Sequence, residues 1–535
     1  MHSSRRWLGL VFISIAVSLI IVDSTIVNVA IPSIVEDLGI TSTQVQWVQE
    51  SYTLVFASLL LVFGSLADRV GRRRLMLTGV VIFAAASVGA ALAPTGDALI
   101  LARLIQGIGG AMILPTTLSL INAGFRGRER GIAFAVWGST IGGMAAVGPL
   151  LGGWLTTDFS WRWAFGINIP LGIVIVIGVL LTITESRDRG AGRVDYVGGM
   201  LSFVTFGALV FGLIEGRTLG WWSVDGDFTI GGWTWPWQVS PVPIAFGVAV
   251  VTAGAFITWC LRRERVGKPA LITLGLFRIP TFRYGNIAAL IVSLGEFGLI
   301  LSLPLWLQFV LGLDALHTGF VLLALAVGSF VASGAAGAST GRVRAVSVVR
   351  IGIIAEIVGV VAVGLAIAPD AAWGWVLPGL FVYGFGVGLA TAQLTGVILA
   401  DVPVAQSGQG SGTQSTSRQV GAALGIAILG TVLFTSTAGV LTSALDARGL
   451  PANEVDQVVS TVVDSAGAAI EELAASSTTA ALADDAKTAF SDGTRWSAFT
   501  AAGFLAVGLA ATFAIPSRRH DDARVAAGET GSDIS

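Results

Sequence analysis

Long apolar runs with few charges recur along the whole chain, and they restrict the folds that it can adopt. Only 12% of its 535 residues are charged and 54% are hydrophobic, whereas a soluble domain carries about 25% charged residues. About 20 apolar residues in a helix cross the hydrocarbon core of a bilayer. Lipid cannot hydrogen-bond backbone amides, so spanning segments are helices or a closed barrel, and a barrel would show alternating rather than continuous apolar runs. The sequence therefore predicts an all-α integral membrane protein.

Fourteen runs are long and apolar enough to be spans. The first follows Arg5 and Arg6, as a signal peptide would. Because it continues from Trp7 to Ala30 with no small-residue cleavage site, we expect it to remain as the first span. The predicted spans are residues 7–30, 46–66, 75–93, 98–121, 131–155, 163–183, 196–215, 241–261, 285–310, 318–338, 350–368, 375–399, 415–436 and 497–516.

The basic residues set the orientation of these spans. With the N-terminus inside the cell, most of the 31 Lys and Arg residues, including Arg418, fall on the inner side. This matches the excess of Lys and Arg in the cytoplasmic loops of membrane proteins. Arg103 is the only basic residue that this topology places in the membrane interior. We therefore expect a multi-pass protein of a bacterial-type cytoplasmic membrane with both termini in the cytoplasm.

Asp23 is an acid deep in the first span. An ionisable side chain inside a membrane costs several kcal/mol and is by default a mark of function. One interpretation is that Asp23 binds and releases protons or cations. The other is that Ser24, Thr25 and Asn28 hold it for packing alone. We favour the first as a hypothesis and include Asn28 among the residues of a substrate cavity.

Other charged residues fall within later spans. Glu296 lies near the middle of the ninth span and is a second candidate for proton coupling. Glu50 and Glu356 lie closer to span ends, so each could face a cavity or extend toward water. Arg103 needs an acidic or polar partner inside the membrane, and Asp23 is the natural one if the first and fourth spans are neighbours.

The segment from Gly64 to Arg74 separates the second and third spans. It holds one acid, Asp68, four arginines and a second glycine, Gly71. Such a segment cannot lie in hydrocarbon, so we expect a tight turn that faces water.

Several other site types are not indicated. The chain has three histidines and one cysteine, which give no zinc-ligand cluster, and no Walker loop or nucleophile elbow is visible. We therefore expect no metal, no cofactor, no nucleic-acid partner and no enzymatic activity.

Glycines of the fifth span, among them Gly148 and Gly152, lie a helical turn apart, which favours close helix packing over substrate contact.

Taken together, five segments resemble motifs of the major facilitator superfamily, and specifically of its fourteen-helix drug:proton antiporter branch. They occur in the family's order and in the expected spans. The loop equivalent to Gly64–Arg74 in the second half, residues 337–350, has no acid. We therefore do not expect it to hold the second half closed as the Asp68 loop would hold the first. The matching segments are Asp23–Pro32, Gly64–Arg74, Arg103 with Gln106 and Gly107, Gly148-Pro149-Leu150-Leu151-Gly152-Gly153, and Trp161-Arg162-Trp163 with Asn168-Ile169-Pro170.

The resemblance implies a major facilitator fold of two six-helix bundles with two inserted helices, working by alternating access. It links the motif of Arg103, Gln106 and Gly107 to proton transfer and implies an antiporter helix motif at Gly148, Pro149, Gly152 and Gly153. Gln106, together with Asp23 and Glu296, is also a candidate residue of the substrate cavity. A conformational latch would comprise Gly64, Asp68, Arg69, Gly71 and Arg72. The expected divisions are a first bundle (1–183), inserted helices (184–262), helices 9–13 (263–436), an extracytoplasmic loop (437–495), the last helix (496–516) and a cytoplasmic tail (517–535).

Two outer segments stand apart from the spans. In residues 437–495 we expect a helical hairpin that starts at Pro451, acting either as a plain connector or as a gate or partner site. Residues 216–240 are rich in tryptophan, which suits the headgroup interface, with an aromatic binding platform as the alternative. The tryptophans are Trp221, Trp222, Trp233, Trp235 and Trp237.

The sequence thus predicts a monomeric, proton-coupled exporter of amphiphilic, cationic compounds, with protons, substrate and the lipid bilayer as its partners. The alternative within transport is an exporter of one metabolite, such as an antibiotic, an amino acid or a lipid-like compound. From another class, a membrane enzyme or a sensor that does not transport remains as a hypothesis.

Overall fold

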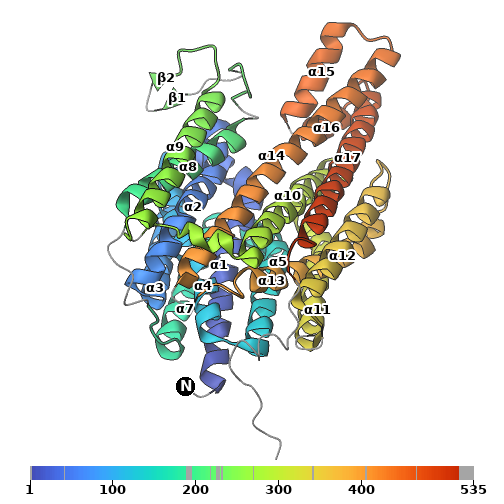
Figure 1. The fold of residues 1–535 in the computed structure, drawn as a ribbon. Coiled ribbons are helices and arrows are strands. Elements are labelled where there is room, and N and C mark those ends of the chain that lie inside the picture. Colours follow the sequence, from blue (N-terminus) through green and yellow to red (C-terminus); the bar gives the residue numbers. More distant parts are fainter. Residues whose placement is uncertain are drawn as a thin grey trace, which may run out of the picture.

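The computed structural model describes residues 3–40, 42–187, 195–216, 219–224, 229–230, 233–268, 270–339, 343–403, 406–465 and 467–516. Within these ranges the protein is almost entirely helical (Figure 1). Long helices follow one another through short turns and run up and down the molecule, as the apolar runs require. The expected cytoplasmic tail, residues 517–535, lies outside the described residues.

The first half of the chain forms seven helices from six predicted spans. The sixth predicted span comprises two helices, because the helix is interrupted at Ile167 between α6 and α7. Thr95 caps α4, its hydroxyl accepting a hydrogen bond from the Ala98 amide. The helices are α1 (Ser3–Leu38), α2 (Ser42–Val70), α3 (Arg72–Ala91), α4 (Gly96–Gly124), α5 (Gly127–Asp158), α6 (Arg162–Gly166) and α7 (Asn168–Thr182).

Two further helices and a small hairpin follow. Helices α8 (Tyr196–Glu215) and α9 (Pro241–Arg265) pack on each other, and α8 packs on α2. Between them, β1 (Thr229–Ile230) and β2 (Trp233–Thr234) pair antiparallel. Three of the predicted interfacial tryptophans form one ring cluster here, with Trp235 and Trp237 4.7 Å apart between centroids.

The second half repeats the pattern of long helices. The predicted outer segment is helical and Pro451 caps α15, as expected. Unexpectedly, α14 and α17 continue through residues 436 and 495, so the boundaries expected there fall inside helices. The elements are η1 (Leu274–Arg278), α10 (Pro280–Phe309), α11 (Ala315–Ser339), α12 (Ala345–Ala366), η2 (Trp373–Val376), α13 (Leu377–Ile398), α14 (Ser407–Ala447), α15 (Ala452–Asp464), α16 (Ala469–Ala475) and α17 (Ala480–Thr512).

Length and hydropathy qualify eight helical segments of the described chain as membrane spans, or nine if the bent α2 is included. The helix α2 bends by 54° between Ser51–Leu60 and Val62–Val70. The all-α membrane class is confirmed, and the number of fourteen spans stays a prediction.

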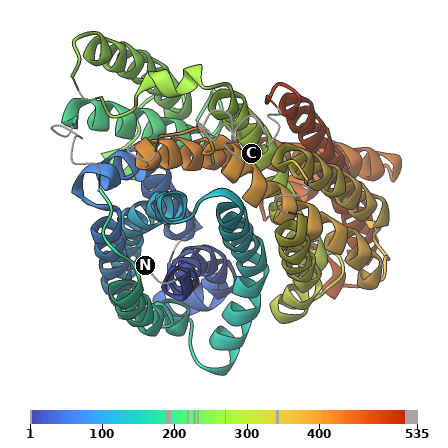
Figure 2. The same cartoon turned by 60° about the horizontal axis from the view of Figure 1, so that its bottom comes forward.

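The helices gather into two groups, which Figure 2 shows side by side: α1–α7 in blue to teal, and α10–α17 in yellow-green to red. Contacts between the groups run from α5 to α11 and α13, and from α2 and α4 to α14. We call the end that carries the N-terminus and the α2–α3 turn the basic end. The opposite end, which carries α15 in Figure 1, is the hairpin end. The Arg448–Asp485 ion pair ties α14 to α17 there.

Close helix packing predicts where a methyl group cannot be tolerated. A Cβ at Gly109 of α4 would lie 2.8 Å from both the Gly79 carbonyl oxygen and the Phe83 amide nitrogen of α3. We expect Gly109→Ala to destabilise the protein by about 1–3 kcal/mol, because the two helix backbones must separate. Thermal unfolding of the purified protein in detergent measures this.

Gly254→Ala on α9 is the matched control, because nothing lies within 4 Å of that Cβ. It should leave the melting temperature unchanged or raise it slightly through helix propensity. Equal melting temperatures for the two variants would contradict the packing of α3 on α4.

Candidate functional site

Asp23 lies at the centre of a hydrogen-bonded cluster inside the first helix group. Its Oδ2 is 2.5 Å from Nη1 of Arg103 on α4. Its Oδ1 accepts hydrogen bonds from Nδ2 of Asn168 on α7 at 2.6 Å and from Nε2 of Gln106 at 3.2 Å. Arg103 is therefore paired with the acid that the sequence suggested, and four polar groups from three helices meet at one point.

The cluster is closed off from solvent in this conformation. Asp23 and Gln106 are 0% exposed and Arg103 is 1% exposed. Arg103 also donates from Nε to the Val48 carbonyl oxygen at 3.2 Å, and its guanidinium carbon lies 4.5 Å from the centre of the Tyr52 ring. A buried ion pair is sustained only when such contacts satisfy the remaining donors. Removing the charge of one partner would leave the other unpaired.

Sequence reasoning missed part of this cluster. Asn168 was recognised as part of a motif but was given no partner, and Ser87 and Tyr52 were not singled out. Ser87 accepts hydrogen bonds from Gln106 at 2.8 Å and from Asn168 at 3.2 Å. A serine in an apolar span carries little signal by itself, since most such hydroxyls bond to their own helix.

A second cluster surrounds Glu296 in the other helix group. Its Oε2 pairs with Nη2 of Arg418 at 3.2 Å, and its Oε1 accepts from the Thr391 hydroxyl at 3.3 Å. The Tyr383 hydroxyl donates to the Glu296 backbone oxygen at 2.9 Å. Arg418, which was expected on the inner side, thus lies beside a buried acid. Helix α14 begins at Ser407 rather than near residue 415, which places Arg418 three turns inside it.

The remaining cavity candidates have different outcomes. Glu356 on α12 is 0% exposed, so the expectation that it faces a cavity or reaches water is wrong for this conformation. A Cβ at Gly386 of α13 would lie 2.7 Å from its Cγ, which shows how closely the two helices enclose it. The side chains of Asn28 and Glu50 lie outside the described residues.

Asp68 connects the two helix groups at the basic end. Its carboxylate accepts hydrogen bonds from the backbone amides of Gly408 at 2.7 Å and Gln409 at 2.9 Å, and from Nη2 of Arg72 at 2.8 Å. Gly408 and Gln409 are in the first turn of α14, where backbone N–H groups have no partner within the helix and the helix dipole favours an anion. The carboxylate is thus bound to the end of a helix from the opposite group.

Two glycines allow this contact and the turn beside it. A Cβ at Gly64 would lie 2.6 Å from the Gly408 carbonyl oxygen, so α2 and α14 meet backbone to backbone. Gly71 has φ +120°, a conformation that L side chains rarely adopt. The Glu185 carboxylate lies against Gly71 and accepts from the amides of Arg73 and Arg74 at 3.1 and 3.0 Å.

The chain before α10 also contacts this junction. The Gln409 side-chain oxygen accepts from the Thr273 amide at 3.1 Å, and Arg69 donates to the Ala270 carbonyl oxygen at 3.2 Å. Asp195, the buried cap of α8, accepts from the Leu271 amide at 3.2 Å. The N-terminal cap of α8 is therefore hydrogen-bonded to the segment before α10, and that segment contacts both α2 and α14 at their junction.

The antiporter-type motif of α5 packs on α1. A Cβ at Gly152 would lie 2.9 Å from the Ile26 carbonyl oxygen, and one at Gly148 would collide with Thr25. A Cβ at Gly153 would lie 3.8 Å from Leu316 of α11. This agrees with close packing as the purpose of these glycines. The side chain of Pro149 lies outside the described residues, as does the 340–342 part of the equivalent second-half loop.

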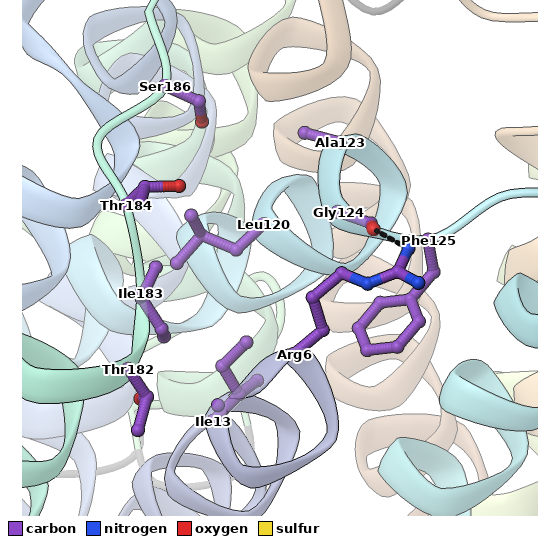
Figure 3. Close-up of a pocket in the computed structure, with 11 residues that line it drawn as sticks. Arg6, Ile13, Leu120, Ala123, Gly124, Phe125, Thr182, Ile183, Thr184 and Ser186 are labelled. Carbon is purple, nitrogen blue, oxygen red and sulfur yellow. Dashed lines mark hydrogen bonds between the residues drawn. The ribbon is translucent and has the colours of Figure 1, made fainter. Parts of the chain in front are cut away.

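A cavity of about 230 Å³ opens in the first helix group at the basic end. Arg6 crosses it and donates to the Gly124 carbonyl oxygen at 3.5 Å (Figure 3). The part of α1 that lines the cavity ends at Ile13, ten residues or about 15 Å before Asp23. The cavity is therefore separate from the acid cluster.

Comparison with known proteins identifies the family. The sequence profile of the Major Facilitator Superfamily matches residues 13–426. The chain belongs to this superfamily. Among its relatives is the multidrug efflux pump LfrA of Mycolicibacterium smegmatis, 32% identical over 518 residues, covering 96% of this chain and 97% of that protein. The family and its relatives indicate a transporter rather than an enzyme.

Other relatives of this superfamily member have narrower names. The puromycin resistance protein pur8 of Streptomyces alboniger is 34% identical and covers 85% of this chain and 86% of its own length. The probable actinorhodin transporter of Streptomyces coelicolor is 33% identical over 83% of this chain and 75% of its own length. These are bacterial transport proteins, consistent with a multi-pass protein of the plasma membrane.

Solved structures agree on the fold. The human organic anion transporter MFSD10 matches with a TM-score of 0.58 and 12% identity, covering 96% of this chain and all of that one (100%). The proton:xylose symporter XylE matches with a TM-score of 0.55 and 14% identity, covering 79% of this chain and 87% of that one. The major facilitator fold of this transporter is therefore confirmed.

The Asp68 contact predicts a measurable change at the basic end. Asp68→Asn removes the charge that the α14 amides bind, and a charged hydrogen bond contributes about 1.5–3 kcal/mol. We expect the separation of α2 from α14 to become at least about tenfold more frequent. Labelling of Ser411→Cys, in a Cys260→Ser background, by a thiol reagent measures it, because Ser411 is buried.

Asp97→Asn is the matched control: Asp97 bonds Gln44 at the hairpin end, within one helix group. Its labelling rate should equal that of the parent. If Asp68→Asn and Asp97→Asn label alike, the Asp68 contact does not hold the basic end closed.

Proposed function

We propose that this protein is a proton-coupled antiporter that exports amphiphilic, cationic compounds across the cytoplasmic membrane by alternating access. The observation that carries the proposal is the buried ion pair between Asp23 and Arg103. In an exporter of this kind, proton entry supplies the free energy for substrate exit. Asp23 is the group of the first helix bundle that would bind the proton.

The proton and the arginine compete for the same carboxylate. While Asp23 is ionised, Arg103, Asn168 and Gln106 hold it and α1 is tied to α4 and α7. Protonation removes the charge and leaves Arg103 without its partner, which favours a rearrangement of these helices. A proton bound from the outer side would in this way bias the equilibrium between two conformations.

The alternation itself would take place at the junction of α2 with α14. We propose that the basic end faces the cytoplasm, with both termini on that side, and that Asp68 keeps it closed in the outward-facing state. The first bundle (1–183), the inserted helices (184–262) and the second bundle (263–436 with 496–516) would act as the moving units of a monomer. The Asp68 contact with Gly408 and Gln409, together with the basic residues nearby, supports this assignment.

The substrate is proposed from charge and from the relatives. Asp23 and Glu296 are the acids of the two clusters, and either of them would attract a cation when ionised and release it when protonated from the outer side. The names of LfrA and of the puromycin resistance protein point to drugs or toxic compounds. A second candidate, export of one specific metabolite, is favoured by the relative described as an actinorhodin transporter. Asn28, Glu50 and Gln106 stay proposed members of the substrate site.

Replacing Asp23 tests the proposal. Asp23→Asn keeps the shape of the side chain and removes the proton-binding group. We expect proton-driven export to fall to the background level while the protein is still inserted in the membrane. The assay is accumulation of a fluorescent lipophilic cation in everted vesicles, or transport in proteoliposomes, under an imposed pH gradient.

Asp37→Asn on the same helix is the matched control. Asp37 is exposed at the hairpin end, and hydrogen bonds from Arg162 and Trp161 lower its pKa below the ordinary value. That lowered pKa keeps it ionised through the neutral range, so it cannot carry protons there, and its replacement should leave export intact. Undiminished pH-driven transport by Asp23→Asn would refute the proposed coupling.

A susceptibility panel separates the two substrate hypotheses. Deleting a multidrug exporter should sensitise cells to many unrelated amphiphilic cations. Deleting an exporter of one metabolite should sensitise them to one compound or its close analogues. The second outcome would discard the multidrug interpretation and keep the transporter.

A further inference from the structure

Glu356 is a buried carboxyl group that the proposed function does not yet use. It lies in the middle of α12 and is 0% exposed. Neither Oε1 nor Oε2 has a hydrogen-bond partner among the residues that the structure describes. The other buried acids described in the helix groups, Asp23, Asp68 and Glu296, each have several partners. This difference needs a physical explanation.

The helices around Glu356 are closely packed. A Cβ on Gly386 of α13 would lie 2.5 Å from the Glu356 amide nitrogen and 2.7 Å from its Cγ. A Cβ on Gly352, one turn earlier on α12, would lie 2.7 Å from the Ala390 amide nitrogen of α13. Glycines on both helices therefore bring the backbones together and enclose the carboxyl.

The charged and titratable groups that act on Glu356 come from three other helices. They are Glu296 on α10, Tyr383 on α13 and Arg418 on α14. On α12 itself, Arg350 is engaged with the Thr512 carbonyl oxygen of α17 at 3.1 Å. Residues 496–512 of α17, which also packs on α12, include no charged residue. Two carboxyls thus depend on one guanidinium, that of Arg418, and Arg418 is bonded to Glu296.

Burial without a partner decides the form of Glu356. An ionised carboxylate that is removed from water and lacks a hydrogen bond costs several kcal/mol. A neutral carboxylic acid avoids most of that cost. The conformation with α2 closed on α14 therefore holds Glu356 with its proton.

We propose that Glu356 is a second proton-binding site of the transporter, and that it shares Arg418 with Glu296. In one arrangement Arg418 pairs with ionised Glu296 and Glu356 holds the proton, as in this structure. In the other, Glu296 holds a proton, Arg418 pairs with ionised Glu356, and the proton of Glu356 has passed to water. The cluster then carries the same charge in both arrangements, and one proton has entered at Glu296 for each that left from Glu356. On the return, the proton of Glu296 passes to Glu356 and Arg418 pairs again with ionised Glu296, so one proton passes through the pair in each cycle.

This inference rests on the proposed proton coupling and deepens it. If Asp23 in the first bundle binds one proton and the Glu296–Glu356 pair transfers another, two sites contribute to each cycle. The number of protons exchanged per substrate should then fall by one when Glu356 is removed, with Asp23 intact.

Glu356→Gln is the decisive variant, because the amide copies the size and neutrality of the protonated acid. The number of protons exchanged per substrate is measured in proteoliposomes from the pH gradient that balances an opposing substrate gradient. We expect this number to be lower by one than in the parent protein. Glu454→Gln, which neutralises an exposed carboxyl of α15 at the hairpin end, is the control and should keep the parent value.

Infrared spectroscopy of the purified protein gives a second test that does not depend on transport. The parent should show the carbonyl stretch of a buried protonated carboxylic acid, and Glu356→Gln should lack it. Glu296→Gln should also lose that band, because Arg418 is then free to pair with ionised Glu356. A band that persists in Glu296→Gln would overturn the shared arginine even if Glu356→Gln failed to fold.

The outcomes separate this inference from the proposed function. A parent protein without any proton-driven transport would overturn both. A parent that couples protons to export, together with a Glu356→Gln variant of the same proton number, would overturn the second site alone.

Discussion

A carboxylate and a guanidinium sealed from water determine what the first helix bundle can do. Asn168, Gln106 and the Val48 carbonyl oxygen complete the hydrogen bonds of Asp23 and Arg103 inside the protein. Any change of charge on Asp23 leaves a buried cation unpaired, so protonation and helix packing cannot vary independently. The proposed coupling is a consequence of this one constraint.

The second bundle also encloses acids beside an arginine, but it has two carboxyl groups and one guanidinium. Glu296 is bound to Arg418, while Glu356 is enclosed without a partner. At the basic end, the Asp68 carboxylate binds the first turn of α14, the same helix that carries Arg418 eleven residues after Ser407. Helix α14 also packs along α10, the helix that carries Glu296. One helix thus physically connects the closed junction with the acids of the second bundle.

Much of this could be predicted from the sequence, because membrane burial makes charges conspicuous. Asp23, Arg103 and Glu296 stand out in apolar runs, and Asp68 stands out in its basic loop. Arg418 was misplaced because the first turns of α14, Ser407–Ser417, are rich in polar residues and resemble a loop. Their helix forms because it packs on α2 and α4, which is tertiary information. The enclosure of Glu356 likewise depends on Gly386 of another helix, which no local pattern reveals.

Modification of Asp23 by a hydrophobic carbodiimide tests the central claim most directly, since the reagent attacks protonated carboxyls that it can reach within the membrane. Mass spectrometry of the protein under transport conditions would locate the adduct. The account predicts that Asp23 is modified, more at low than at high pH, and that a bound cationic substrate protects it. An Asp23 that stays unmodified at every pH, while another carboxyl reacts and is protected by substrate, would contradict the account.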